Sequence, residues 1–205
     1  NILDAKEDAP LHLAIEGGHT RVAQDLLIGG ADHAVRGSKR EYAIHLAASR
    51  GQDEMVLSLV QRGANLDLLD GDGETPLLAA VLEDRVSTVE VLLAEGADAN
   101  INMQLGRYGI GHYSKTALHV AAEFNNAASI PALIEAGANI EAKMTTGFTP
   151  LYCAARFGSC AAMLALLQLG ANVNSKASNG CTPLHTACYN ENVDAADLLL
   201  RWGAD

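Results

Sequence analysis

The sequence predicts an all-α repeat solenoid, that is, a stack of short helix pairs. Three observations support this fold class. A four-residue motif related to Thr-Pro-Leu-His occurs six times, a Gly-Ala-Asp/Asn motif follows each copy at a fixed distance, and both recur every 33 residues. A period of about 20 to 50 residues is typical of chains in which each repeat is one supersecondary unit.

The two motifs define one register. The fourth residue of the first motif is His12, His45, Leu78, His119, Tyr152 and His185. The glycine of the second motif is Gly30, Gly63, Gly96, Gly137, Gly170 and Gly203. Every step is 33 residues except the third, which is 41 in both series, so the chain carries one eight-residue insertion that the register places at 103–110. We therefore predict a single array over 1–205, with repeats at 4–36, 37–69, 70–102, 103–143, 144–176 and 177–205.

Each repeat is expected to begin with a short helix. Threonine is a favourable N-cap because its hydroxyl oxygen accepts from free backbone N–H groups, and the motif places it at Thr75, Thr149 and Thr182. Proline follows each of these at the first helical position, where a missing N–H costs nothing. Small residues such as Ala47 and Ala48 then allow neighbouring helices to approach closely, and a glycine such as Gly158 ends the helix.

A second helix with larger apolar residues and a tight turn complete the unit. Pro131 falls near the first turn of its second helix, where proline is tolerated. The stretches "DGDG" at 70–73 and "SNG" at 178–180 predict tight turns between repeats. Arg40 and Ser114 stand where other turns carry glycine, so we expect these two hairpins to differ in shape.

This pattern resembles the ankyrin-repeat family over nearly the whole chain. The resemblance implies stacked helix-turn-helix ankyrin repeats with β-hairpin loops projecting to one side. It also implies that the motif histidine ties neighbouring repeats together through hydrogen bonds, a role that Leu78 and Tyr152 cannot take over. Because terminal repeats need a polar outer face and the sixth repeat ends in apolar residues including Trp202, we expect this chain to be a piece of a longer one.

The charge of the chain is acidic and unevenly distributed. The net charge is −11, with 8 Lys+Arg against 18 Asp+Glu in 1–102 and 6 against 7 in 103–205. This balance disfavours nucleic acid as a partner, because binding to phosphates requires Lys and Arg. The acidic half is either a solvated face or a surface that steers a basic partner. No apolar run approaches the length of a membrane span and no signal peptide is seen, so we expect a cytoplasmic chain, with the nucleus as the alternative.

The sequence shows no convincing catalytic, metal or cofactor site. The spacing of the cysteines, which are Cys153, Cys160, Cys181 and Cys188, is longer than that of zinc-binding pairs, so they are interpreted as reduced small hydrophobes. The stretch 70–76 lacks the glycine and glutamate of a calcium loop, and 106–111 lacks the glycine spacing and lysine of a phosphate loop. The motif histidines have no nucleophile beside them. We therefore predict no enzyme, no metal, no cofactor and no small-molecule ligand.

Aromatic residues indicate where a partner could bind. Eight of the nine aromatics follow residue 107, and binding hot spots are rich in Tyr, Trp and Arg. The predicted partner-binding residues are Arg107, Tyr108, Tyr113, Phe124, Phe148, Arg156, Phe157, Tyr189 and Trp202. The alternative is that several of these rings pack onto neighbouring repeats. The insertion is expected to project from the binding face, although a neutral surface insertion would also be cheap in loop entropy.

Together these observations predict a non-catalytic module that binds a partner protein or peptide through its concave surface and hairpin loops. One alternative is a structural spacer or scaffold within a larger membrane or signalling protein. The other is the targeting domain of an enzyme whose catalytic domain lies outside this chain.

Overall fold

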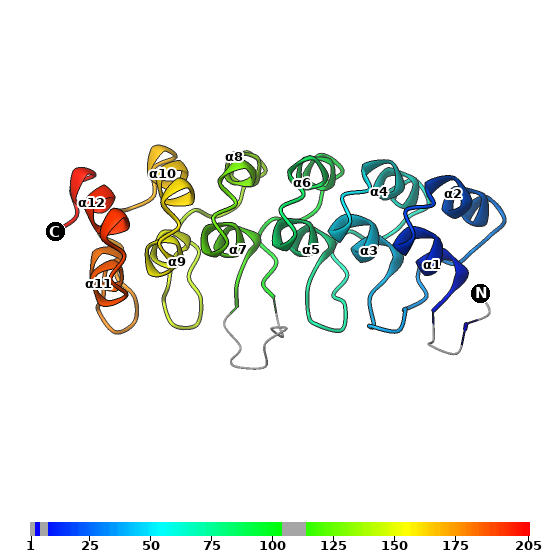
Figure 1. Ribbon diagram of the computed structural model, residues 1–205, viewed down its shortest axis with the longest axis horizontal. Helices are drawn as coiled ribbons and strands as arrows, with labels where there is room; N and C mark the ends of the chain where they lie inside the picture. Colours follow the sequence, from blue (N-terminus) through cyan, green and yellow to red (C-terminus); the bar gives the residue numbers. More distant parts are fainter. Residues whose placement is uncertain (1–2, 5–7, 104–113) are drawn as a thin grey trace. The chain divides into compact units, whose positions relative to one another are not determined.

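The computed structural model describes residues 3–4, 8–103 and 114–205, and the chain forms two compact units, Asn1–Asp98 and Ala99–Asp205 (Figure 1). The described residues contain helices and turns but no β-strand, apart from an isolated antiparallel bridge between Arg36 and Tyr42. The predicted all-α class is therefore confirmed, and the described connections between repeats are hairpin-like turns without strands.

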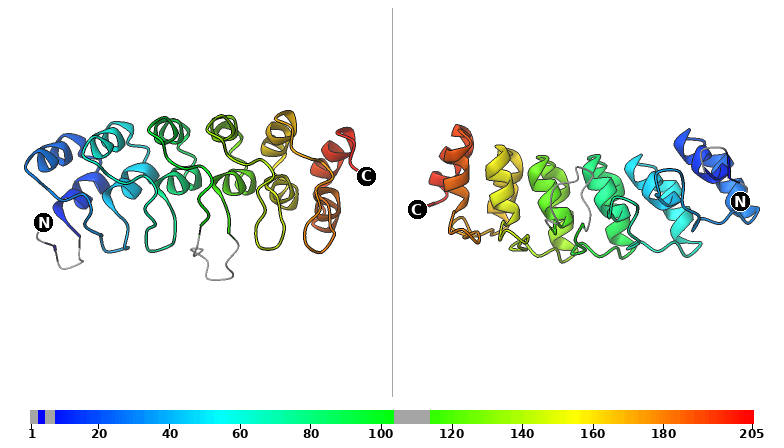
Figure 2. Two further views of the ribbon diagram at one scale, coloured as in Figure 1. Left: turned by 180° about the vertical axis from the view of Figure 1, so that it is seen from behind. Right: turned by 90° about the horizontal axis from the view of Figure 1, so that it is seen from below.

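The first unit contains three helix pairs. Within it, α1 packs on α3 and α3 on α5, while α2 packs on α4 and α4 on α6, so that first and second helices form two rows (Figures 1 and 2). The pairs are α1 (Pro10–Glu16) with α2 (Thr20–Ile28), α3 (Ala43–Ser49) with α4 (Asp53–Val60), and α5 (Pro76–Leu82) with α6 (Val86–Ala94).

The second unit repeats this arrangement. Its first helices α7, α9 and α11 pack on one another in order, and its second helices α8, α10 and α12 do the same. The pairs are α7 (Ala117–Glu123) with α8 (Ile130–Glu135), α9 (Pro150–Phe157) with α10 (Cys160–Gln168), and α11 (Pro183–Tyr189) with α12 (Val193–Arg201). A short 3₁₀ helix, η1 (Ala127–Ser129), precedes α8 and places Pro131 in its first turn, as predicted.

The predicted helix starts are confirmed. The hydroxyl oxygens of Thr75 and Thr149 accept the backbone N–H of Leu78 at 3.2 Å and of Tyr152 at 3.3 Å. Thr182 makes the same cap and forms a capping box with His185. A proline follows each of these threonines at the first helical position, so local chemistry alone determines where these helices begin.

One backbone hydrogen bond closes every turn between repeats. The N–H of the first turn residue donates to the carbonyl four residues later, at 2.8–3.0 Å, in the pairs Gly37–Glu41, Asp70–Glu74, Met144–Phe148 and Ala177–Cys181. In the turn between the third and fourth repeats the corresponding bond joins Met103 and Lys115 at 2.7 Å, twelve residues apart. The eight additional residues of this repeat therefore lie between Met103 and Lys115. Ten of the residues between them, 104–113, lie outside the described residues.

The hairpin of Arg40 keeps the closing hydrogen bond of the other turns and, among the described turns, is the one that carries a β-bridge, between Arg36 and Tyr42. Arg40 has φ of 61°, close to the 74° of Gly73 in the next turn, and its N–H donates to the Gly37 carbonyl at 2.8 Å. The hydrogen-bonded turn thus imposes a left-handed backbone on an arginine, at an energetic cost that glycine would avoid. Ser114 is also left-handed, with φ of 50°.

The core of each unit lies between its two rows of helices. Leucines of the second helices, such as Leu59 and Leu92 in the first unit and Leu133 and Leu166 in the second, are fully buried. The paired alanines of the first helices are also buried. Because alanine has a single methyl group, it lets adjacent first helices approach closely, and this positions their C-terminal ends side by side.

A second set of hydrogen bonds links adjacent repeats, and the sequence did not predict it. The residue before a second helix reaches back to the end of the preceding repeat's first helix. In the first unit, Gln52 Nε2 donates to the Ile15 carbonyl at 2.8 Å. In the second unit, Asn192 Nδ2 donates to the carbonyls of Ala155 at 3.0 Å and Arg156 at 2.9 Å.

Candidate functional site

A groove of about 470 Å³ lies between α9 and α11 of the second unit. On the α9 side it is bordered by Phe148, from the preceding turn, and by Tyr152 and Arg156. On the α11 side the lining residues are Asn179, Cys181, His185, Thr186, Tyr189 and Asn190. Three of the predicted partner-binding residues, Phe148, Arg156 and Tyr189, are therefore brought together here.

Stacked side chains form the α9 wall of this groove. The rings of Phe148 and Tyr152 stack with centroids 4.1 Å apart and an interplanar angle of 11°. The Arg156 guanidinium lies 5.9 Å from the Phe148 ring centre and 5.6 Å from that of Phe157. Both distances lie within the range of cation–π attraction, which orients the guanidinium without neutralising its charge.

Tyr152 occupies the position at which other repeats have the motif histidine. In α7 this residue is His119, which is fully buried; its Nε2 lies 3.0 Å from the Phe148 carbonyl, and its Nδ1 lies 3.2 Å from the Thr116 backbone nitrogen. His119 thus ties α7 to the next turn, as the resemblance implied. Tyr152 makes no such bond among the described residues, and its ring instead stacks on Phe148 and borders the groove.

The histidine ties differ from repeat to repeat. His45 Nε2 lies 3.0 Å from the carbonyls of both Leu68 and Glu74, so it links α3 to the following turn. His12 is buried, but neither of its ring nitrogens has a hydrogen-bond partner among the described residues. Burial lowers the pKa of His45, and it lowers the pKa of His119 to about 4. Both imidazoles are therefore neutral structural groups near pH 7.

The remaining predicted partner-binding residues differ in exposure. Phe124, Phe157 and Tyr189 are 49%, 53% and 88% exposed, and each stands at the C-terminal end of a first helix. Trp202 is 41% exposed at the end of α12, away from the groove lining. Three further residues lie outside the described residues: Arg107, Tyr108 and Tyr113.

Tyr152, Cys181 and His185 also line this groove, and the sequence did not predict them there. His185 was interpreted as a structural motif histidine and Cys181 as a small hydrophobe. The one available signal was Tyr152 itself, because an aromatic ring at a histidine position cannot make the histidine hydrogen bond and is free to line a surface. Pairing that ring with α11 required knowledge of how the repeats stack.

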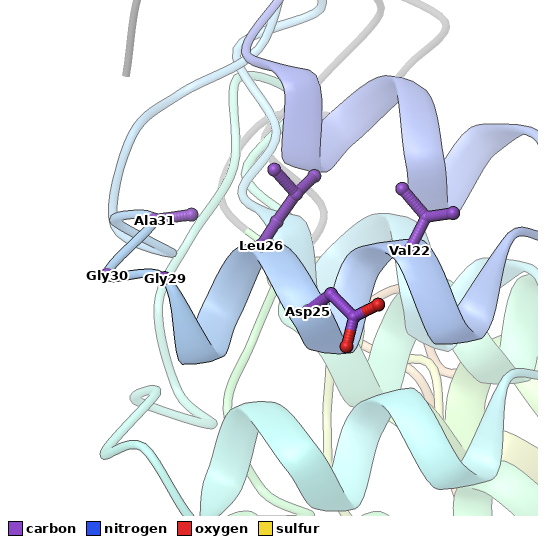
Figure 3. Close-up of a pocket in the computed structure, with 6 residues that line it drawn as sticks. All are labelled: Val22, Asp25, Leu26, Gly29, Gly30 and Ala31. Atoms are coloured by element: carbon purple, nitrogen blue, oxygen red, sulfur yellow. The ribbon is translucent and has the colours of Figure 1, made fainter.

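A second cavity, of about 400 Å³, lies on α2 in the first unit (Figure 3). Val22, Asp25, Leu26 and residues 29–31 line it. Val22 is 53% exposed, whereas Met55 and Thr88, one and two repeats further along, are fully buried. Val22 therefore occupies a position that is buried by helix packing in the later repeats but is exposed here. The cavity beside it has no cluster of polar groups that would recognise a ligand.

The cysteines show no metal-binding or disulfide geometry. All four are free, and they range from Cys153, which is buried, to Cys188, which is exposed. Burial raises the pKa of the Cys153 thiol to about 12, so this thiol is not a nucleophile at neutral pH. Across residues 3–4, 8–103 and 114–205, no group of three or more His, Cys, Asp or Glu side chains is arranged to hold a metal ion.

Within the same residues, no helix has both the length and the apolar character needed to cross a bilayer.

Comparison with known proteins agrees with this geometry. A family model described as ankyrin repeats matches residues 11–104 and 118–205, which leaves unmatched the segment that contains most of the insertion. The nuclear factor NF-kappa-B p105 subunit of Gallus gallus is 30% identical over 157 residues, covering 73% of this chain and 15% of that protein. The B-cell lymphoma 3 protein homolog of Mus musculus is 32% identical over 153 residues, covering 72% and 32%.

A solved structure supports the same assignment. The human ASB11 ankyrin repeat domain superposes with a TM-score of 0.84 at 27% identity, covering 97% of this chain and 85% of that one. The chain spans between about a seventh and a third of the length of the two curated relatives. The repeat period, the capped helix pairs and these matches together show that the chain belongs to the ankyrin-repeat family.

Proposed function

We propose that this chain is a non-catalytic protein–protein interaction module whose binding site lies in the second unit. The site consists of Phe124, Phe157 and Tyr189, with Arg156 between the last two; we call these four residues the aromatic surface. Ankyrin-repeat relatives support the general role of a protein-interaction module. The aromatic surface is the observation that supports this location for the site.

The exposure of the three aromatic rings supports this location. Phe124, Phe157 and Tyr189 end the successive first helices α7, α9 and α11, and each leaves about half or more of its surface in water. Aromatic rings in this position add little to the stability of the fold, because the apolar area that they bury is small. In a binding interface the same rings supply large contact areas at low cost in conformational entropy.

The first unit offers no comparable surface. The positions that correspond to Phe124 and Phe157 are Gly17, Arg50 and Glu83, and Arg50 forms an ion pair with Glu16 at 3.1 Å. A surface of exposed, paired charges contributes little binding energy by itself. We therefore propose that the second unit binds the partner, while the first unit acts as a spacer or attracts a basic partner electrostatically.

The test compares two triple variants as bait in an affinity capture from lysate of the source cells. The first carries Phe124→Ala, Phe157→Ala and Tyr189→Ala. The matched control carries Leu13→Ala, Val22→Ala and Ile28→Ala, which removes three exposed apolar side chains from the first unit. Both must retain the thermal melting of the parent chain.

We expect the parent chain and the control to retain the same partner and the first variant to lose it. If all three baits hold the same proteins equally well, the aromatic surface is not the binding site. If none holds any protein, the alternative of a structural spacer within a larger protein is favoured.

A further inference from the structure

The groove between α9 and α11 presents hydrogen-bond donors that lack an acidic partner. Arg156 is exposed, and among the described residues no carboxylate lies within ion-pair distance of its guanidinium. Its contacts are instead with the rings of Phe148 and Phe157. An arginine held over aromatic rings keeps its full charge and a fork of N–H donors, which matches the two oxygens of a carboxylate.

His185 adds a second donor to the same groove. Its Nδ1 lies 2.8 Å from the Thr182 hydroxyl oxygen and 3.4 Å from the Thr182 backbone nitrogen, which can only donate. Nδ1 is therefore an acceptor, and in the neutral ring the hydrogen is on Nε2. In His119 the equivalent Nε2 hydrogen bonds the Phe148 carbonyl. In His185 it has no acceptor among the described residues, and the side chain is exposed at the groove.

In the second unit, the described cations and carboxylates lie mostly on different elements. On the turns and first helices, the described cations are Lys115, Lys143, Arg156 and Lys176, and the one carboxylate, Glu123, is paired with Lys115. The other described carboxylates belong to the second helices or to the loops that adjoin them: Glu135, Glu141, Glu191, Asp194, Asp197 and Asp205. The turns and first helices of the second unit thus carry more described cations than carboxylates, while Glu191 directly follows the groove residue Asn190 and Glu141 lies two residues before Lys143.

We propose that this groove binds an acidic peptide segment of a partner protein. An Asp or Glu carboxylate is received by the Arg156 guanidinium and the Nε2–H of His185, and a neighbouring apolar side chain of the peptide packs against Phe148, whose ring stacks on the buried Tyr152. The inference rests on the proposed function and names its ligand. A single arginine fork fits one carboxylate, whereas recognition of a phosphorylated side chain uses a cluster of arginines.

The experiment selects ligands without assuming a partner. A display library of random 12-residue peptides is panned against the whole immobilised chain. The most enriched peptide, and an analogue in which each Asp and Glu is replaced by Asn or Gln, are then titrated by fluorescence polarisation. The proteins are the parent chain, Arg156→Gln, Arg156→Lys and, as matched control, Arg201→Gln. Arg201 is also an exposed cation of the second unit, but it lies on α12 and pairs with Asp197 at 2.7 Å.

We expect the enriched peptides to carry Asp or Glu beside an apolar residue. Arg156→Gln should weaken binding by at least about tenfold, Arg156→Lys by less, and Arg201→Gln by less than about twofold, since truncation of one partner of a desolvated charge pair is costly and a distant charge is not. The analogue in which Asn or Gln replaces each Asp and Glu should bind the parent chain more weakly than the original peptide does, by the same factor. The Arg156→Gln variant should bind this analogue and the original peptide with nearly equal affinity, because the change in the protein and the change in the peptide remove the same interaction.

Other results would overturn the inference. Enriched peptides without acidic residues, or equal binding by the parent chain and Arg156→Gln, contradict it. If such peptides still lose binding to the Phe124→Ala, Phe157→Ala, Tyr189→Ala variant, the proposed function stands and only the acidic ligand is wrong. If no peptide is enriched over the unselected library, the acidic-peptide inference fails, and the capture experiment alone decides the proposed function.

Discussion

His119 makes the stability of the second unit sensitive to acid. The side chain is fully buried, Nδ1 accepts the Thr116 N–H, and Nε2 donates to the Phe148 carbonyl. A proton added to Nδ1 would place a charge in the core and would oppose the Thr116 N–H, leaving the Thr116 hydroxyl oxygen at 2.9 Å to accept it, so the folded chain resists protonation here mainly because the ring is buried. The perturbation is acidification of the parent chain and of a His119→Gln variant, in which the glutamine can still cap the helix but does not titrate.

The expected effect follows from the pKa values. Burial lowers the pKa of His119 from 6.5 to about 4 in the folded state. Because the folded value is the lower one, the unfolded chain binds the proton first as the pH falls. The stability contribution is therefore complete above pH 6.5, declines from there to about pH 4, and changes no further below that. At about 1.4 kcal/mol per pH unit, the total loss is roughly 3 kcal/mol, of which about 2 kcal/mol is lost by pH 5.

The assay is denaturant unfolding followed by the fluorescence of Trp202, the one tryptophan of the chain, which lies in the second unit. Between pH 7.5 and pH 5 the parent chain should lose about 2 kcal/mol more stability than His119→Gln. Other groups, including His45, titrate in both proteins and cancel in the difference. Equal losses in the two proteins, or an NMR titration of the His119 ring with a midpoint near 6.5, would refute the reasoning.

Three further predictions concern single side chains. Thr149→Ala removes the cap on the Tyr152 N–H and should lower the free energy of unfolding by about 1 kcal/mol, measured by denaturant titration. Arg40→Gly, at φ of 61°, should raise it by up to about 1 kcal/mol in the same assay; a decrease would show that the arginine side chain matters more than its backbone strain. In the native chain, a thiol reagent at pH 8 should label Cys188 in preference to Cys153, whose thiol is buried; mass spectrometry of the labelled peptides checks this.

The repeat architecture could be predicted from sequence because its determinants are local. A threonine followed by proline favours a helix start, and all three such pairs in this chain begin one, since the cap and the missing N–H involve only nearby residues. The period of 33 residues then indicates that these units stack. At Arg40 residue preference did not decide the backbone, because the arginine takes the left-handed conformation in a turn that the hydrogen bond between Gly37 and Glu41 closes.

Ties between repeats were predictable only where one residue type recurs. The motif histidine was expected to link repeats, and His45 and His119 do so, while the ring nitrogens of His12 have no hydrogen-bond partner among the described residues. The ties made by Gln52 and Asn192 were not expected. The residue that makes this hydrogen bond before the second helix differs between repeats, so no recurring motif marks its position.

The sequence alone determined the family and the concentration of aromatics in the second half, and it predicts the register of the repeats and the place of the insertion. Only the tertiary structure decided which of those aromatics face water and which pack. Phe148 and Tyr152 stack on each other, whereas Phe157 and Tyr189 remain exposed beside Arg156. The reason is physical: the environment of a ring depends on neighbours one repeat away, and these are brought within a few ångströms only when the helices pack.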